Sequence, residues 1–560
     1  MIEDDDGTVR KALLYRGTPE NPAFWERVVF DLPLAAAIMS VAIGPSGPND
    51  VYLHQLNSFL LSTHHRGDTD GAFDLSGSVG DACTGRLARL VLSLQSFYRP
   101  YFLFGSGSNE HNQLLLRSHE EHNDEIDNYD DAGMEDDDGL CSNEAGVSEM
   151  TELLLVVPRK EPAIESSINN CDDQPRSLHA GGGHSALLTN GGDLYLWGWN
   201  DSGQLGRSDS TMTSNTSSEQ DSVKGDGLVA DSQSSSPLSN VVVPPLSFKV
   251  ESVGLGHNHT LVIEKDTGRL FGFGDDGRGQ VSGLRGDSKV SSSWFIPRLI
   301  KFDLLEEESD GFVAVAAGLF HSAAIARRFG ELITWGCGRF GQCLRSTSAV
   351  TDEDGASTMG RWKPPDGSKL VQVTCGRRHT ALLDEHGRVW TMGDNKYGQL
   401  GRLSSTLSYH EPKLVHGPLG QIDSGCFSIH TGWSHIIALT RDNEGTVSVY
   451  GWGRNDKGQL GMNSVNFHVF VPRVIDLLIN DDIVVQTACC GAESSHIRYT
   501  NGDIYSTGWN EHGNLAIGNV GEVCKREYST KWMVSSGASV VASPSDVILI
   551  AAGGAHLIAT

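Results

Sequence analysis

The sequence predicts an all-β protein, a single seven-bladed β-propeller closed by pairing of its first and last blade segments. Two repeated patterns lead to this prediction. A glycine shortly before a histidine, followed by a short apolar strand, recurs seven times, and an aromatic-rich strand followed by a Gly-rich turn also recurs seven times. A sheet built from one such unit cannot bury both of its faces, whereas stacking the sheets around an axis buries each against the next.

The first repeated unit is the apolar strand that begins at the histidine. Propeller symmetry would distribute these histidines around the ring, one to a blade. We therefore expect a structural role for them, such as hydrogen bonding to a turn, and no metal site. The repeat histidines are His184, His259, His321, His379, His435, His496 and His556.

The second repeated unit is the aromatic-rich strand, whose turn often ends in Gly-Gln-Leu-Gly. Glycine contributes 65 of the 560 residues and proline only 19, which indicates many tight turns between short strands. We expect the aromatic side chains to fill the space between blades. These are Trp197, Phe271, Trp335, Trp390 and Tyr450.

The order of the two units predicts how the ring closes. Within each repeat the histidine strand precedes the aromatic strand. The repeats nevertheless begin with an aromatic strand alone, Tyr101–Phe104, and end with a histidine strand alone, His556–Ala559. These two orphans together make one complete blade, so their pairing would remove two exposed sheet edges.

The segments outside the repeats have different compositions. Residues 1–100 show no repeat, and apolar spacing predicts one helix over 84–99. The propeller is expected to span 101–560. Two stretches within it, the acidic 117–150 and the Ser-rich 207–240, are predicted to be disordered inserts.

Composition limits the class of protein. The formal net charge of −28 disfavours binding to a phosphate backbone, so no direct nucleic-acid binding is expected. The longest apolar run, Leu32–Gly44, is too short to span a membrane. The acidic start of the chain does not resemble a signal peptide, and the ten cysteines show no Cys-x-x-Cys pair. We therefore expect a cytoplasmic or nuclear monomer with reduced thiols.

Motifs for catalysis are not found in the sequence. Gly272–Gly277 and Gly336–Gly341 match the dinucleotide fingerprint, but strands follow them where a phosphate-binding helix would be required. There is no Walker A motif, no His-Glu-x-x-His and no Gly-x-Ser-x-Gly. The sequence predicts neither catalytic residues nor a cofactor.

Taken together, Gly-x-x-His and Trp-Gly-x-Asn-x-x-Gly-Gln-Leu-Gly resemble the regulator of chromosome condensation repeat family. The resemblance covers residues 101–560 and implies a seven-bladed propeller with about four strands per blade. Members include an exchange factor for the Ran GTPase, a plant UV-B receptor and modules of large ubiquitin ligases. The same fold therefore serves several functions.

The resemblance also implies a binding face. In the family, the two residues before each repeat histidine lie on the face where partners bind. In the exchange factor several of these residues are acidic or polar, whereas here only Glu493 is acidic and aromatic and basic residues dominate. The predicted partner-binding residues are His257, Asn258, Phe320, Arg377, Arg378, Trp433 and Glu493.

Three functions remain open from the sequence. The first is a non-catalytic platform whose protein partner, an acidic protein, docks at Arg377, Arg378 and Trp433. The second is a guanine-nucleotide exchange factor for a Ran-like small GTPase, which would act by stabilising the nucleotide-free GTPase. The third is a chromatin adaptor, against which the acidic amino terminus argues. For Leu319 and Phe320 there is also a structural alternative, that they only fill the mouth of the central channel.

Overall fold

The computed structural model describes only part of the chain. Two compact units make up the chain. One contains residues 103–153, 172–207 and 244–560, and the other contains 1–102, 154–171 and 208–243. Of the second unit only residues 98–102 and 154–158 are described. The described residues are 98–108, 146–158, 172, 174–207, 246–283, 293–301, 311–344, 359–403, 408–462, 467–475, 484–500, 504–516, 530–531 and 549–560.

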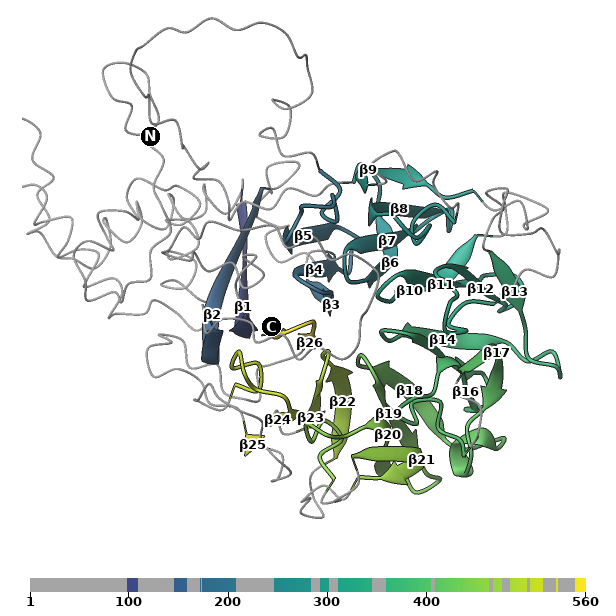
Figure 1. The fold of residues 1–560 in the computed structure, drawn as a ribbon. Helices are drawn as coiled ribbons and strands as arrows, with labels where there is room; N and C mark the ends of the chain where they lie inside the picture. The colour runs from purple at the N-terminus through teal and green to yellow at the C-terminus, as the bar shows by residue number, and fades with distance from the viewer. Residues whose placement is uncertain are drawn as a thin grey trace, which may run out of the picture. The chain divides into compact units, whose positions relative to one another are not determined.

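Within these ranges the strands form seven antiparallel sheets arranged in a ring, six of four strands and one of three (Figure 1). This confirms the seven-bladed propeller. Blades 1 to 3 consist of β3 (Pro175–Ala180), β4 (His184–Thr189) and β5 (Leu194–Gly198); β6 (Val250–Leu255), β7 (His259–Glu264), β8 (Leu270–Asp275) and β9 (Ser293–Leu299); and β10 (Phe312–Ala317), β11 (His321–Ala326), β12 (Leu332–Gly336) and β13 (Gly360–Trp362).

The remaining blades follow the same order, from an inner strand through the histidine and aromatic strands to an outer strand. A short 3-10 helix, η5 (Pro418–Gly420), lies between blades 4 and 5 in the sequence. Blades 4 to 6 are β14 (Leu370–Cys375), β15 (His379–Asp384), β16 (Val389–Asp394) and β17 (Ser408–Leu414); β18 (Cys426–Thr431), β19 (His435–Arg441), β20 (Val447–Arg454) and β21 (His468–Val474); and β22 (Val485–Cys490), β23 (Ser494–Tyr499), β24 (Ile504–Gly508) and β25 (Thr530–Lys531).

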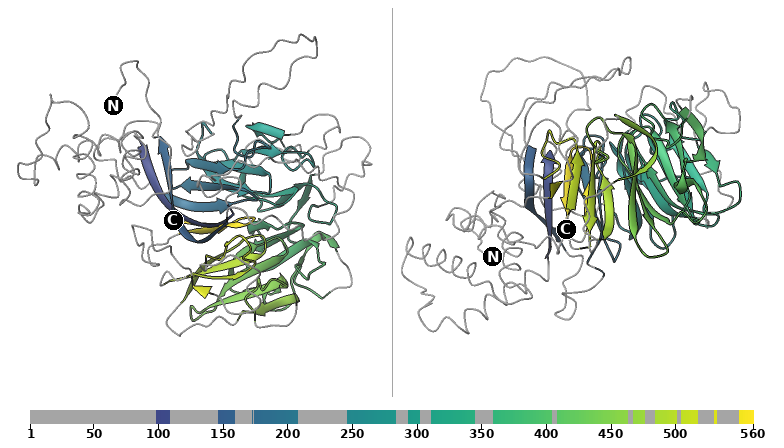
Figure 2. Two further views of the ribbon diagram at one scale, coloured as in Figure 1. Left: turned by 60° about the vertical axis from the view of Figure 1, so that its left-hand side comes forward. Right: turned by 90° about the horizontal axis from the view of Figure 1, so that it is seen from below.

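Blade 7 joins both ends of the repeat region. It holds β26 (Ile550–Ala552), β27 (His556–Ala559), β1 (Tyr98–Ser108) and β2 (Gly146–Pro158), in the order β2-β1-β27-β26. The register places Phe104 opposite Ala559 and Gly107 opposite His556. In Figure 2 the purple β1 lies beside the yellow carboxyl-terminal strands, and the predicted closure is confirmed.

The core lies between neighbouring blades. Strands β4, β7, β11 and β15 are buried along their whole length, because each lies in the middle of a sheet that is covered on both faces. The predicted aromatic fillers Trp197, Trp335 and Trp390 are buried. Phe271 is partly buried against the cluster that joins blades 1 and 2, and Tyr450 against the cluster that joins blades 4, 5 and 6.

Two predicted boundaries are wrong. Tyr98 and Arg99 belong to β1, so the helix expected over 84–99 does not extend that far, and residues 84–97 lie outside the described residues. Residues 146–150, expected to end the acidic insert, form the start of β2. Pairing with β1 supplies backbone partners that composition does not reveal. The other predicted insert residues, 117–145 and 208–240, also lie outside the described residues.

Candidate protein-binding face

The two-residue loops before the repeat histidines all lie at one end of their sheets. In every blade the second loop residue uses its carbonyl to accept a hydrogen bond from the residue after the aromatic strand's glycine. Examples are Asp275 N to Asn258 O at 2.8 Å and Asp394 N to Arg378 O at 2.9 Å. The loops and the Gly-rich turns therefore share one side of the ring, which we call the loop face.

The Gly-x-x-His motif has a steric cause. The motif glycine faces the ring of its own histidine, and a β-carbon at Gly376 would collide with the His379 imidazole. Such a β-carbon would also lie 2.7 Å from the Gly432 carbonyl oxygen of the next blade. Glycine thus lets the loop approach both the histidine and the neighbouring loop closely.

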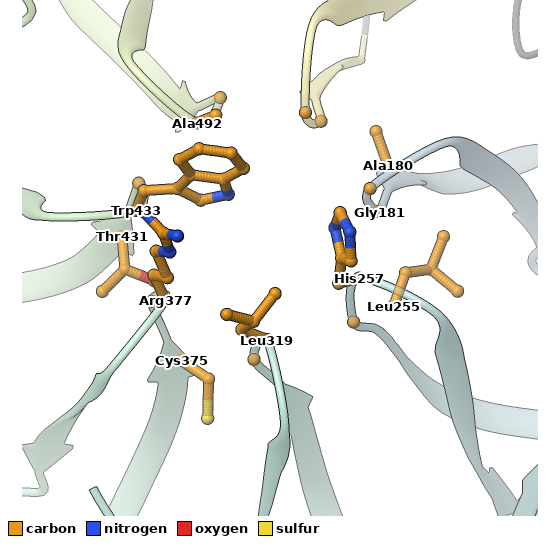
Figure 3. A pocket seen from close by; sticks show the side chains of 18 of the residues that line it. Ala180, Gly181, Leu255, His257, Leu319, Cys375, Arg377, Thr431, Trp433 and Ala492 are labelled. Carbon is orange, nitrogen blue, oxygen red and sulfur yellow. The ribbon is translucent and has the colours of Figure 1, made fainter. Parts of the chain in front are cut away.

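The first loop residues surround the central channel. Backbone hydrogen bonds link consecutive loops, such as Arg377 N to Trp433 O at 3.0 Å and Trp433 N to Ala492 O at 2.9 Å. They enclose a cavity of about 90 Å³ into which His257, Leu319, Arg377 and Trp433 project (Figure 3). Small-molecule sites are usually about 300–1,000 Å³, so this cavity suits a single side-chain group rather than a metabolite.

Arg377 and Trp433 come together across blades 4 and 5. The guanidinium carbon of Arg377 lies 5.0 Å from the Trp433 ring centroid. Burial, with a further contribution from Arg378, lowers the pKa of Arg377 from its ordinary value. The guanidinium still carries its charge at neutral pH, so this part of the channel is positively charged.

Arg378 lies further out on the loop face, over an aromatic residue of blade 3. Its guanidinium carbon is 4.3 Å from the centroid of Phe340, and Arg339 is 5.6 Å from the same ring. Neither Arg339 nor Phe340 was predicted as a site residue. They belong to the turn after β12, and ring adjacency alone brings that turn beside Arg378.

The channel-filling role considered for Leu319 and Phe320 applies to Leu319 alone. Leu319, not Phe320, lines the channel. Phe320 lies 6.0 Å from the guanidinium of Arg278, on the turn of blade 2. The structure thus places Phe320 on the loop face, beside the turn of blade 2.

Glu493, the only acidic residue in the two-residue loops, is engaged within the protein. Its carboxylate accepts a hydrogen bond from Arg454 at 2.5 Å, and Arg454 also pairs with Asp456 at 2.6 Å. Burial raises the pKa of Glu493, while Arg454 opposes that shift. His257 lies on the opposite side of the channel mouth (Figure 3). Its ring makes an edge contact with Trp199, with the ring centroids 6.2 Å apart, and Asn258 follows it in the loop.

Five of the seven repeat histidines bridge neighbouring blades. Nε2 of His184 lies 3.0 Å from the Thr260 hydroxyl, and Nε2 of His321 lies 3.1 Å from the Thr380 hydroxyl. The same kind of contact links His259 to Ser322, His435 to Ser495 and His556 to Ser185. Burial lowers the pKa of each repeat histidine to about 3 or 4, so the rings stay neutral.

In blade 6 the predicted repeat position, His496, is wrong. Ser494, not His496, lies opposite Gly508, in the register that His184 takes opposite Gly198. The reason is the distance from the motif glycine: a β-carbon at Gly491 would meet the Ser494 hydroxyl. The loop of blade 6 is therefore Ala492 and Glu493 and no longer than the others. His496 remains buried and bonds to the hydroxyls of Ser494 and Ser506.

Two further features concern the described ranges only. No three His, Cys, Asp or Glu side chains lie close enough there to hold a metal ion together. No helix in those ranges has the length and apolar character that crossing a membrane requires.

Comparison with known proteins identifies the family. The family model for the RCC1-like domain matches residues 102–559. The chain belongs to the RCC1-like family. Its relatives include the Ultraviolet-B receptor UVR8 of Arabidopsis thaliana, 29% identical over 61% of this chain and 67% of that protein. The Secretion-regulating guanine nucleotide exchange factor of Mus musculus is 26% identical over 69% of this chain and 75% of that protein.

A solved structure shows the same fold. Prp20p from Saccharomyces cerevisiae, whose structure was described with its binding to Gsp1p and histones, has a TM-score of 0.55 to this chain. The identity is 18%, and the match covers 83% of this chain and 93% of Prp20p. At this identity the likeness concerns the fold. The function of this RCC1-like chain must therefore be inferred from the residues of its own loop face.

Proposed function

We propose that this RCC1-like chain is a non-catalytic protein-interaction platform whose partner docks on the loop face over blades 3 to 5. The observation that carries the proposal is the group of arginines and aromatic rings around the channel mouth. The Arg377 guanidinium lies over the Trp433 ring there, and the Arg378 guanidinium lies over the Phe340 ring further out on the loop face. Tryptophan and arginine are the residue types that most often carry binding energy at protein interfaces.

Partner capture from an extract tests the proposal. The variant Arg377→Glu with Arg378→Glu should reduce capture at least about tenfold, because it removes two cations from the proposed site and adds two anions. The matched control is Arg298→Glu with Arg473→Glu, which makes the same charge change on the outer strands β9 and β21. Equal capture by the loop-face variant and the wild type would reject the site.

A second candidate function is guanine-nucleotide exchange on a Ran-like small GTPase. The 26% identity to an exchange factor favours it. Against it, the one acidic side chain of the loops, Glu493, is already held by Arg454. A nucleotide-release assay separates the two functions. Faster release of labelled GDP from a Ran-like GTPase would support exchange, and an unchanged rate would leave the platform function alone.

A further inference from the structure

In the described ranges, three loop-face arginines have no carboxylate within ion-pair distance, although the chain carries a net charge of −28. Glu493 and Asp394 act on Arg377 and Arg378 only through longer-range charge interactions. Within the described part of the chain, Arg339, Arg377 and Arg378 form neither an ion pair nor a side-chain hydrogen bond. We call these three residues the arginine cluster. The neighbouring Arg454 differs, since it pairs with both Asp456 and Glu493.

Aromatic rings hold the arginine cluster in place. Arg339 and Arg378 share the ring of Phe340, and Arg377 lies over Trp433. Such stacking uses the flat face of the guanidinium and leaves its N–H edge available for hydrogen bonds. A guanidinium whose orientation is already fixed loses less entropy when it binds an anion.

Arg377 is the member of the cluster that most needs an anion. Its side chain is partly buried, and its Nε has no acceptor within the described residues. A buried donor without an acceptor is costly, and a carboxylate would satisfy it. The adjoining cavity of about 90 Å³, into which Arg377 projects, has room for one carboxylate group (Figure 3).

We propose that the arginine cluster binds an Asp- and Glu-rich segment of the partner protein. One carboxylate enters the channel mouth beside Arg377, and others meet Arg339 and Arg378. Carboxylates match the planar guanidinium fork and can accept two parallel hydrogen bonds from it. This inference rests on the proposed function and adds the chemistry of the partner.

The test uses the full chain and two fluorescent peptides. One peptide alternates Glu with Gly, and its control replaces every Glu by Gln. The Glu peptide should bind saturably and more weakly as salt is added, whereas the Gln peptide should not bind. Arg339→Glu with Arg378→Glu should weaken binding at least about tenfold, and Arg298→Glu with Arg473→Glu should change it less than about twofold.

Each other outcome overturns the inference. It fails if the Glu peptide binds no better than the Gln peptide, or if the outer-strand control weakens binding as much as the cluster variant. It fails too if a single-stranded DNA oligonucleotide of matched charge binds more tightly than the peptide. Partner capture in parallel separates the two proposals. If capture depends on Arg377 and Arg378 while the Glu peptide does not bind, the platform function stands and the acidic partner is rejected.

Discussion

At the scale of single residues, a histidine bonded to a hydroxyl of the next blade links the blades at five of the seven interfaces. The Thr380 hydroxyl donates to the Gln342 carbonyl at 2.9 Å, so its oxygen must accept from His321 Nε2–H. His379 lacks this contact, because the equivalent position in blade 5 is Ile436, and neither of its ring nitrogens has a partner within the described residues.

Replacing one hydroxyl should measure what this contact contributes. Thr380→Val nearly preserves the side-chain shape but leaves His321 Nε2 and the Gln342 carbonyl without a partner. We expect the free energy of unfolding to fall by about 1–3 kcal/mol in chemical denaturation. The companion variant Ile436→Thr offers His379 the missing hydroxyl and should remain within about 1 kcal/mol of the wild type. A neutral Thr380→Val would contradict this account of the histidines.

Single residues also show which positions of the site can be predicted from the sequence. Six repeat histidines were located correctly, because steric contact fixes the interval between the glycine and the histidine. In blade 6 the prediction of His496 is wrong, because Ser494 and not a histidine stands at that interval from the motif glycine. Arg339 and Phe340 were missed because their contact with Arg378 depends on which blades are neighbours.

At the scale of elements, the blades protect their edges in two ways. Outer strands β9, β17 and β21 each carry a proline, Pro297, Pro412 and Pro472, two residues before the strand end. Proline cannot donate to an added strand, so these edges resist pairing with another chain. In blade 7 the pairing of β27 with β1 removes the two edges that the incomplete units would otherwise expose, and β2 is the outer strand. The sequence predicted this closure from its two incomplete units.

Removing the closing strands tests whether the ring needs the pairing of β27 with β1. Deletion of residues 549–560 takes away β26 and β27, which leaves β1 paired with β2 alone and uncovers the faces of blades 1 and 6. We expect aggregation and loss of a cooperative thermal transition, measured by light scattering and calorimetry. Shortening the Ser-rich stretch 208–240, predicted to be a loop, should leave the transition intact. A soluble and cooperatively folding deletion variant would show that closure is dispensable.

At the scale of the whole molecule, the buried histidines make stability depend on pH. In the unfolded chain a histidine has a pKa near 6.5, whereas burial lowers it to about 3 in His184 and His259. Below pH 6.5 the unfolded state therefore binds protons that the folded state does not. Stability is fully present above that pH and is lost as the pH falls toward the folded pKa.

Calorimetry at two pH values checks this dependence. Between pH 7.5 and pH 5.5 each buried neutral histidine should cost about 1 kcal/mol, so the melting temperature should fall clearly. Most carboxylates titrate below this window, which assigns the effect to histidine. Return to pH 7.5 should restore the melting temperature. An unchanged melting temperature at pH 5.5 would mean that the repeat histidines are not buried as neutral rings.

The whole ring presents one loop face, and the function proposed for the molecule depends on that face. Amide hydrogen exchange of the full chain, free and with its captured partner, locates the contact directly. Bound partner should slow exchange in 336–341, 376–379 and 432–435, which carry the loops and turns of blades 3 to 5, and leave β9 and β21 unchanged. Protection confined to the outer strands, or to the opposite side of the ring, would contradict a platform built on Arg377, Arg378 and Trp433.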